Sequence, residues 1–270
     1  METQTNAHDL QANIKGYLEE LARDTDLAHK SESIQRYLEF AAKFHRYSPT
    51  NIMLILLEKP DATHVMGFNS WKKLNRFVKR GERGIAIFAP LIRNENSDNE
   101  NPLKVLSGFR LVYVFDVSQT DGESLPPVPN WKSPEKNNQL NEKLTAFAQS
   151  RGVVVTFKNL SGDIQGISKG KAIEVDNHAG TKTLIHEIAH ELMHRGDDCP
   201  GNQAIRELQA EATAFVVAKH FGLQGLNSSN YLALFNVNSA DLFQYIVDIQ
   251  KTASTIIGCI SGDLPKGLRD

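Results

Sequence analysis

The sequence predicts an α+β fold, in which a mixed N-terminal half is followed by a small sheet and a group of helices. Apolar residues recur at helical spacing near both ends of the chain. Short runs of β-branched and aromatic residues lie between them, and a polar, proline-rich stretch separates the two halves. Strands and helices that are grouped along a chain in this way are typical of α+β architecture.

Composition limits the class of protein before any motif is considered. The chain has 270 residues, 40% of them hydrophobic, and a net charge of −2, which is typical of a globular protein of one or two domains. This balance excludes a global nucleic-acid or membrane signature, so any such signal must be local. Two cysteines are too few for a disulfide framework. With no signal-peptide pattern and no apolar run long enough to span a bilayer, we expect a cytoplasmic protein without a membrane partner.

The N-terminal half begins with helices and continues with mixed structure. Residues 8–47 have helical periodicity, and the chain breaks at 48–51 before a short apolar helix. The expected elements are that helix over 52–57, a strand over 63–68, a helix over 71–79 capped by Ser70, a strand over 85–92, a polar loop over 93–102 and a strand over 109–117.

A linker is predicted over about residues 118–138, where four prolines fall in polar sequence. We therefore expect a boundary near residue 130 and two domains, over 1–130 and 139–270. The alternative is a long surface loop within one domain.

The C-terminal half is expected to contain a small sheet and then helices. The elements are a helix over 139–150, strands over 153–157 and 172–175, a helix over 180–195 that Gly196 ends, a helix over 203–221, and two helical stretches within 228–260.

The predicted helix over 180–195 carries the motif His186-Glu187-x-x-His190. Residues four apart lie on one face of a helix, so both imidazoles can bind one metal ion. Glu187 can then face a water molecule at that ion and act as a general base. Histidines at this spacing are also found as ordinary surface or core residues, but the apolar helical flanks favour a metal site.

A catalytic zinc site needs a third protein ligand. His194 lies four residues beyond His190, but His186 and His194 would stand about 11 Å apart along a straight helix, too far to share an ion. We expect His194 to be structural, to support a ligand or to face substrate. Cys199 could reach back from a loop, although a thiolate with two histidines is uncommon in hydrolases.

Two glutamates on the next helix are better candidates. Glu207 and Glu211 share one face, and small alanines around them would let the two helices approach closely. One carboxylate can ligate the metal while the other holds the N–H of a ligating histidine. The sequence leaves open which glutamate does which, and the alternative is that both are solvated.

An H-E-x-x-H motif followed by E-x-x-x-[DE] on the next helix resembles the gluzincin class of zinc peptidases. The resemblance implies that Glu207 is the third ligand and that Glu211 orients a histidine. It implies a zinc metalloendopeptidase. The expected metal is Zn²⁺, with another divalent metal such as Mn²⁺ as the alternative. The group that stabilises the oxyanion is open, with His178, His194 and Tyr231 as candidates.

A basic segment lies in the N-terminal half, over residues 71–83. It contains six basic residues against the single acid Glu82. Cations can neutralise phosphates and an aromatic ring can stack on an unpaired base, so the segment is a candidate surface for single-stranded DNA. The alternative is a solvated helix face with Trp71 and Phe77 in the core. The candidate DNA-binding residues are Trp71, Lys72, Lys73, Arg76, Lys79, Arg80 and Arg83.

Several separated segments resemble ArdC-type antirestriction proteins. They lie at residues 48–52, 61–71, 78–90, 114–122, 183–190 and 207–217. The resemblance covers roughly residues 30–225 and implies a single-stranded-DNA-binding N-terminal domain joined to a zincin-like metallopeptidase domain. It also implies carriage on plasmids or mobile elements and protection of incoming DNA from restriction.

Three hypotheses about function follow. The protein is a bifunctional antirestriction protein, a DNA-coating protein whose metal site does not cleave, or a regulatory protease like ImmA and IrrE that cuts a repressor. The protein substrate would be a restriction component or a repressor. Glu187 favours a hydrolase, because a structural zinc site needs no general base.

Overall fold

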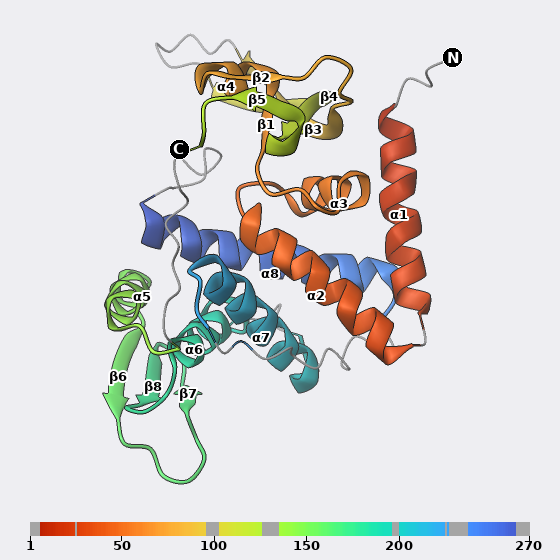
Figure 1. The fold of residues 1–270 in the computed structure, drawn as a ribbon. Helices are drawn as coiled ribbons and strands as arrows, with labels where there is room; N and C mark the ends of the chain where they lie inside the picture. The colour runs from red at the N-terminus through yellow and green to blue at the C-terminus, as the bar shows by residue number, and fades with distance from the viewer. Residues whose placement is uncertain are drawn as a thin grey trace. The chain divides into compact units, whose positions relative to one another are not determined.

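The chain folds into two compact units. The first combines Met1–Tyr17 with Thr50–Pro126, and the second combines Leu18–Pro49 with Pro127–Asp270. Helices and three small sheets confirm the α+β class (Figure 1). This computed structural model describes residues 6–24, 26–95, 103–125, 135–195, 200–224, 226 and 237–262.

Helix α2 (Leu27–Lys43) belongs to the second unit, although the sequence assigned all of 1–130 to one N-terminal domain. It packs on α7 (Gln203–His220), and the imidazole Nδ1 of His220 lies 2.9 Å from the carbonyl oxygen of Ala42. The apolar face of α2 is therefore buried against a helix that is distant in sequence, which local patterns could not reveal.

The first unit is built around a three-stranded antiparallel sheet in the order β1-β4-β3 and a two-stranded pair, β2-β5. The strands predicted over 63–68, 85–92 and 109–117 are confirmed, and two of them extend into a long hairpin. The elements are α1 (Ala7–Arg23), α3 (Pro49–Glu58), β1 (Val65–Gly67), α4 (Phe68–Lys73), β2 (Arg76–Val78), β3 (Ile85–Glu95), β4 (Leu103–Asp116), the 3₁₀ helix η1 (Val117–Gln119) and β5 (Thr120–Gly122). The end of α1 from Leu18 and the first residue of α3, Pro49, belong to the second unit.

Helix α3 protects the free edge of β3. The side-chain amide of Asn51 donates to the carbonyl oxygen of Phe88 at 2.8 Å and accepts from its N–H at 2.9 Å. An edge strand presents unpaired backbone groups, and this contact satisfies two of them.

The helix predicted over 71–79 is wrong in its bounds. Helix α4 begins at Phe68 and ends at Lys73, and Arg76–Val78 forms strand β2, which pairs with β5. Asn75 has a φ of 53°, in the left-handed region that asparagine tolerates, and it ends the helical path. The basic segment is thus divided between a helix and a strand.

The second unit places helices around a three-stranded sheet in the order β6-β8-β7, with β6 parallel and β7 antiparallel to β8. The predicted helices over 139–150, 180–195 and 203–221 and the two predicted strands are confirmed over the described residues. Two helical stretches were expected within 228–260, and one helix, α8 (Ser239–Ser261), is described there. The centre of the predicted linker, 126–134, and much of 228–260 before α8 lie outside them. The elements are α5 (Asn138–Ser150), β6 (Val154–Lys158), β7 (Gly166–Ser168), β8 (Ala172–Asp176), α6 (Thr181–Met193), α7 and α8 (Ser239–Ser261).

Strand β7 was not predicted from the sequence. It forms a tight hairpin with β8, in which Gly170 and Lys171 have φ values of 77° and 60°. Two consecutive residues with positive φ form the turn type whose twist suits a two-residue hairpin. The strand has three residues, too few for an alternating pattern to be visible.

Within the described residues, none of the helices is both long enough and apolar enough to cross a membrane.

Candidate metal centre

Helix α6 presents His186 and His190 on one face, one turn apart. The opposite face is held in the core by Leu184, Ile185 and Ile188, each at most 1% exposed. The two imidazoles are largely buried, with side-chain exposures of 21% and 15%. The apolar stripe thus determines which way the histidines face.

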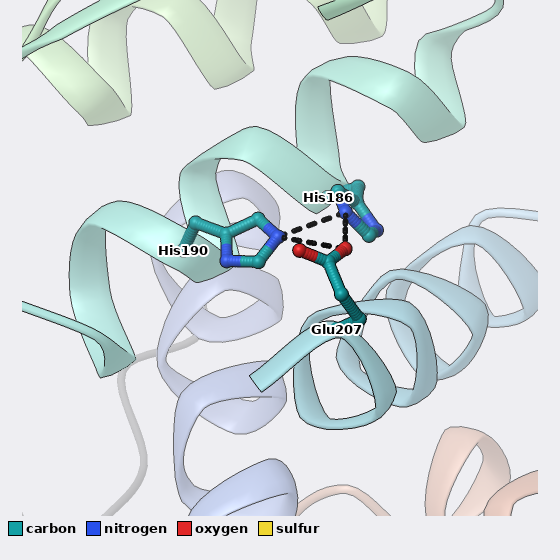
Figure 2. Close-up of side chains that lie close together, drawn as sticks. All are labelled: His186, His190 and Glu207. Carbon is teal, nitrogen blue, oxygen red and sulfur yellow. Dashed lines mark hydrogen bonds and ion pairs between the residues drawn. The ribbon is translucent and has the colours of Figure 1, made fainter. Parts of the chain in front are cut away.

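A carboxylate from α7 completes a triangle with these two imidazoles. The Nε2 atoms of His186 and His190 lie 2.9 Å apart, and Oε2 of Glu207 lies 3.4 and 3.5 Å from them (Figure 2). All three atoms fall within 4.8 Å of one another. Three electron-pair donors that converge in this way fit a divalent cation, and nitrogen with oxygen is a donor set that zinc takes.

Glu211 lies on the other side of the His186 ring. Its Oε2 atom is 3.4 Å from Nδ1 of His186, and its Oε1 atom is paired with the ammonium of Lys182. The carboxylate is therefore placed to accept the Nδ1–H of His186, which leaves Nε2 free to face Glu207. Contacts of this kind orient the ligands of metal sites.

His190 has a corresponding partner in His194. Their Nδ1 atoms lie 3.0 Å apart, and Nε2 of His194 lies 3.1 Å from Oε1 of Gln209, which is 2% exposed. Because the amide oxygen only accepts, the proton of His194 is on Nε2, and its Nδ1 accepts from His190. His190 is thereby held with Nε2 unprotonated. His194 stands outside the ligand triangle, beside one of its ligands.

Glu187 is 8% exposed and lies against strand β7. A Cβ atom on Gly166 would come within 2.7 Å of its Oε1 atom, so only glycine allows the strand to approach this closely. Burial raises the pKa of Glu187, and the nearby carboxylates Glu207 and Glu191 add to the increase. A carboxylate with a raised pKa is better suited to accept a proton near neutral pH.

The pKa values of the two histidines are shifted in opposite directions. Burial lowers the pKa of His186, but the surrounding carboxylates, Glu211 above all, outweigh it and raise that pKa. Burial and the neighbouring His186 lower the pKa of His190 to about 4. The pair without metal therefore holds its proton on His186.

A buried carboxylate, Glu191, fixes strand β7 over the site. It accepts from the backbone N–H groups of Gly170 and Lys171, each at 2.9 Å, and forms an ion pair with Arg195 at 2.8 Å. The hydroxyl of Ser168 donates to it as well. Strand and helix together border a solvent-open cavity of about 460 Å³ whose lining includes His186, Glu187, His190, His194, Arg206 and Glu207.

The remaining candidates of the C-terminal half are His178, Cys199 and Tyr231, of which the structure describes only His178. His178 is exposed and contacts Asp176. Cys199 and Tyr231 lie outside the described residues. Neither the oxyanion role nor the thiolate alternative gains support from these three.

The basic segment of the first unit is only partly available to a ligand. Trp71 is fully buried, and its indole N–H donates to the carbonyl oxygen of Phe115 at 2.8 Å. A ring without a free face cannot stack on a base, so the predicted stacking role of Trp71 is corrected to a core role.

Two of the predicted DNA-binding cations also have structural contacts. The guanidinium of Arg76 donates to the hydroxyl and carbonyl oxygens of Thr120, at 2.8 and 2.9 Å, and ties β2 to β5. Lys79 donates to the carbonyl oxygen of Ser118 at 3.0 Å. The other four, Lys72, Lys73, Arg80 and Arg83, are exposed and form no ion pair within the described residues.

Sequence reasoning missed four residues that shape the metal centre: Gly166, Lys182, Glu191 and Gln209. Glu191 and Gln209 could have been found from the sequence, because each is a polar residue at a position that helical spacing places on the buried, apolar face of its helix. Gly166 and Lys182 had none, because their importance depends on contacts with other elements.

Comparison with known proteins identifies the family. Residues 9–144 match the family described as the N-terminal domain of anti-restriction factor ArdC. An uncharacterized protein of Bacillus anthracis is 25% identical over an alignment of 291 positions, which covers 87% of this chain and 49% of that protein. The chain thus spans about half the length of that relative.

Two crystal structures of the antirestriction protein ArdC from plasmid R388 are also similar. The metal-free form is 15% identical with a TM-score of 0.47, covering 81% of this chain and 86% of that one. The Mn(II)-bound form is 16% identical with a TM-score of 0.46, covering 80% and 88%. Because the family match extends over half of its sequence, this chain belongs to the ArdC family of antirestriction proteins.

Proposed function

We propose that this protein protects incoming plasmid or mobile-element DNA from restriction, binds single-stranded DNA through its first unit and hydrolyses a peptide bond at the metal centre of its second. The observation that carries the proposal is the convergence of His186, His190 and Glu207 within 4.8 Å. Glu187 lines the same cavity, and a purely structural metal site has no use for such a base.

The proposed cofactor is Zn²⁺, with Mn²⁺ as the alternative. Two imidazoles and one carboxylate match the ligand set of catalytic zinc sites, which keep one position open. The alternative takes its support from the R388 protein, one of whose two crystal structures is Mn(II)-bound. A divalent ion at this site would supply Lewis acidity and lower the pKa of a water molecule toward neutrality.

The residues around the metal centre are proposed to carry out proton transfer, ligand orientation and oxyanion stabilisation. Glu187 takes the proton of the attacking water and returns it to the leaving amine. Glu207 serves as the third ligand, and Glu211 orients His186. Arg206 lines the cavity, and one N–H of its guanidinium donates to the carbonyl oxygen of Pro200 at 2.8 Å. It forms no ion pair within the described part of the chain, so its remaining N–H groups are our candidate for stabilising the oxyanion.

The proposed substrate is an extended peptide segment. Strand β7 is the outer strand of its sheet, and its backbone lies directly over Glu187. An open edge of this kind can pair with a peptide strand, which would bring a peptide bond toward the metal centre. This zincin-like arrangement is consistent with cleavage of a restriction component.

Conjugation into a restricting host tests the proposal. Donors carry the wild-type gene, a Glu187→Gln variant or a variant with Lys72, Lys73, Arg80 and Arg83 replaced by glutamate. We expect wild-type protein to raise plasmid establishment and both variants to lose this protection.

The alternatives give different results. Full protection by Glu187→Gln would support a DNA-coating protein with a non-cleaving metal site. Cleavage of a repressor without any protection would support an ImmA- and IrrE-like regulatory protease. Absence of protection by the wild-type protein would overturn the antirestriction function for this chain.

A further inference from the structure

The solvent-facing side of the sheet in the first unit is aromatic. An antiparallel sheet that packs one face on a core usually presents polar residues on the other. The inward face follows this rule with Ile85, Ile87 and Val114, which are at most 5% exposed. The outward positions of β4 are instead Phe109, Leu111, Tyr113 and Phe115, at the alternate spacing that puts them on one face.

The rings on this face are open to solvent. Phe109 is 62% exposed and Tyr113 is 49% exposed. Their partners on β3 are the small residues Pro90 and Ala86, which leave the rings uncovered. At the end of the row, the ring of Phe68, itself 54% exposed, meets Phe115 edge-on with centroids 6.5 Å apart.

The chain approaches this aromatic face closely at Gly84. A Cβ atom there would lie 2.8 Å from Cβ of Tyr113 and 2.9 Å from Cζ of Phe115. Glycine therefore lets the backbone after Arg83 lie against both aromatic side chains. Arg83 is thereby placed at the border of the aromatic face.

Three cations border the aromatic face. Lys72 and Lys73 end the helix that Phe68 begins, and Arg83 precedes Gly84. All three are exposed and none forms an ion pair within the described residues. In a two-fold dimer the same patch would meet itself, and these like charges would oppose one another. Aromatic rings among free cations instead match the bases and phosphates of a nucleic acid strand.

We propose that Phe68, Phe109 and Tyr113 form a stacking platform for unpaired bases, with the bordering cations on the phosphates. This inference rests on the proposed single-stranded-DNA binding of the first unit and assigns it a surface. Phe109 and Tyr113 are four residues apart on one strand, about 13 Å, so different bases can stack on them. Duplex DNA would not use the platform, because its bases already stack on each other.

Replacing the rings tests the platform. Phe109→Leu and Tyr113→Leu keep apolar surface but remove the aromatic face, whereas Phe109→Tyr and Tyr113→Phe keep it. With an oligo-dT strand and fluorescence anisotropy, we expect about tenfold weaker binding for each leucine variant and near wild-type binding for each aromatic variant. The slope of affinity against salt should not change, because no phosphate contact is lost. Phe157→Leu, at a 40% exposed phenylalanine of the second unit, is the matched control.

Each outcome decides one question. If the wild-type protein does not bind oligo-dT, the DNA-binding function and the platform both fail. If it binds and the leucine variants bind equally well, only the platform fails. If the leucine variants dissociate a dimer in sedimentation while DNA affinity stays the same, the face is a contact between copies. Photocrosslinking of bromouracil-substituted strands supplies a readout without substitution, and we expect the crosslinks on peptides of β4.

Discussion

The Nδ1 atoms of His190 and His194 lie 3.0 Å apart, and the far nitrogen of His194 meets the buried amide oxygen of Gln209. This chain of contacts determines which nitrogen of His190 carries the proton. His194 looks like an additional ligand in the sequence but serves the site by holding His190 in the tautomer that a metal requires.

Loss of this contact should weaken metal binding. We expect Gln209→Ala to lower metal affinity about 10- to 100-fold, because His194 would no longer be held in one tautomer. Gln209→Glu keeps an acceptor and should retain most of the affinity. Gln203→Ala, at an exposed glutamine lining the same cavity, is the control. Competition with a coloured chelator measures the affinity, and equal values for Gln209→Ala and wild type would contradict the role of the contact.

Metal affinity should rise with pH. Without metal, the raised pKa of His186 favours a proton on this ring, and the ion must displace that proton. His190, with a pKa of about 4, is already neutral. Affinity should therefore increase until the pH exceeds the raised pKa of His186 and then level off. Calorimetry in buffers of different ionisation enthalpy should find proton release that approaches one per ion as the pH falls below the raised pKa of His186.

The matched variant for this pH dependence is Glu211→Gln. The carboxylate of Glu211 is the main group that raises the pKa of His186, so its removal should shift the rise in affinity to lower pH. A profile that does not move would mean that another group supplies the proton.

Removal of the proposed base should separate catalysis from metal binding. We expect Glu187→Gln to reduce peptide hydrolysis by about 10²- to 10⁴-fold, because the amide cannot accept the proton of water. Metal content, measured by mass spectrometry of the purified protein, should stay unchanged since Glu187 is not in the ligand triangle. Hydrolysis at the wild-type rate would exclude a peptidase that uses this residue.

Strand β7 should tolerate no side chain at its first position. In Gly166→Ala the new methyl group would come within 2.7 Å of Glu187, so the strand or the carboxylate must move. A displacement of about 1 Å can cost 10²-fold in rate, and we expect a loss on this scale with metal affinity retained. Gly201→Ala, where a Cβ atom meets nothing within 4 Å, is the control. Equal rates for both variants would show that the close approach has no catalytic importance.

The cations of the first unit should determine how DNA affinity depends on salt. Replacing Lys72 and Lys73 by glutamate should weaken binding of single strands and lower the salt slope by about 1.4, if each lysine contacts one phosphate. Anisotropy titrations over a range of salt concentrations measure both effects. Reversal of Lys143 and Lys251 in the second unit changes the net charge equally and should leave the slope unchanged. Arg76 is not a suitable target because its guanidinium holds β2 to β5.

Local patterns predicted most of the helices and strands because these depend on the spacing of apolar residues along the chain. The errors occur where contact with residues distant in the sequence determines the local structure. Arg76–Val78 becomes a strand because Thr120–Gly122 pairs with it, and α2 joins the second unit because α7 covers its apolar face.

The sequence by itself determined the family, the α+β class and the pair of histidines on one helical face, because a spacing of four residues is a property of the helix alone. Only the tertiary structure decided which carboxylate meets those histidines. It brings Glu207 to their Nε2 atoms and Glu211 to the opposite nitrogen of His186, and it buries Trp71 while leaving the rings of β4 exposed. Local sequence determines which residues share a face of a helix or strand. The packing of other elements determines which of those faces is buried and which residues meet.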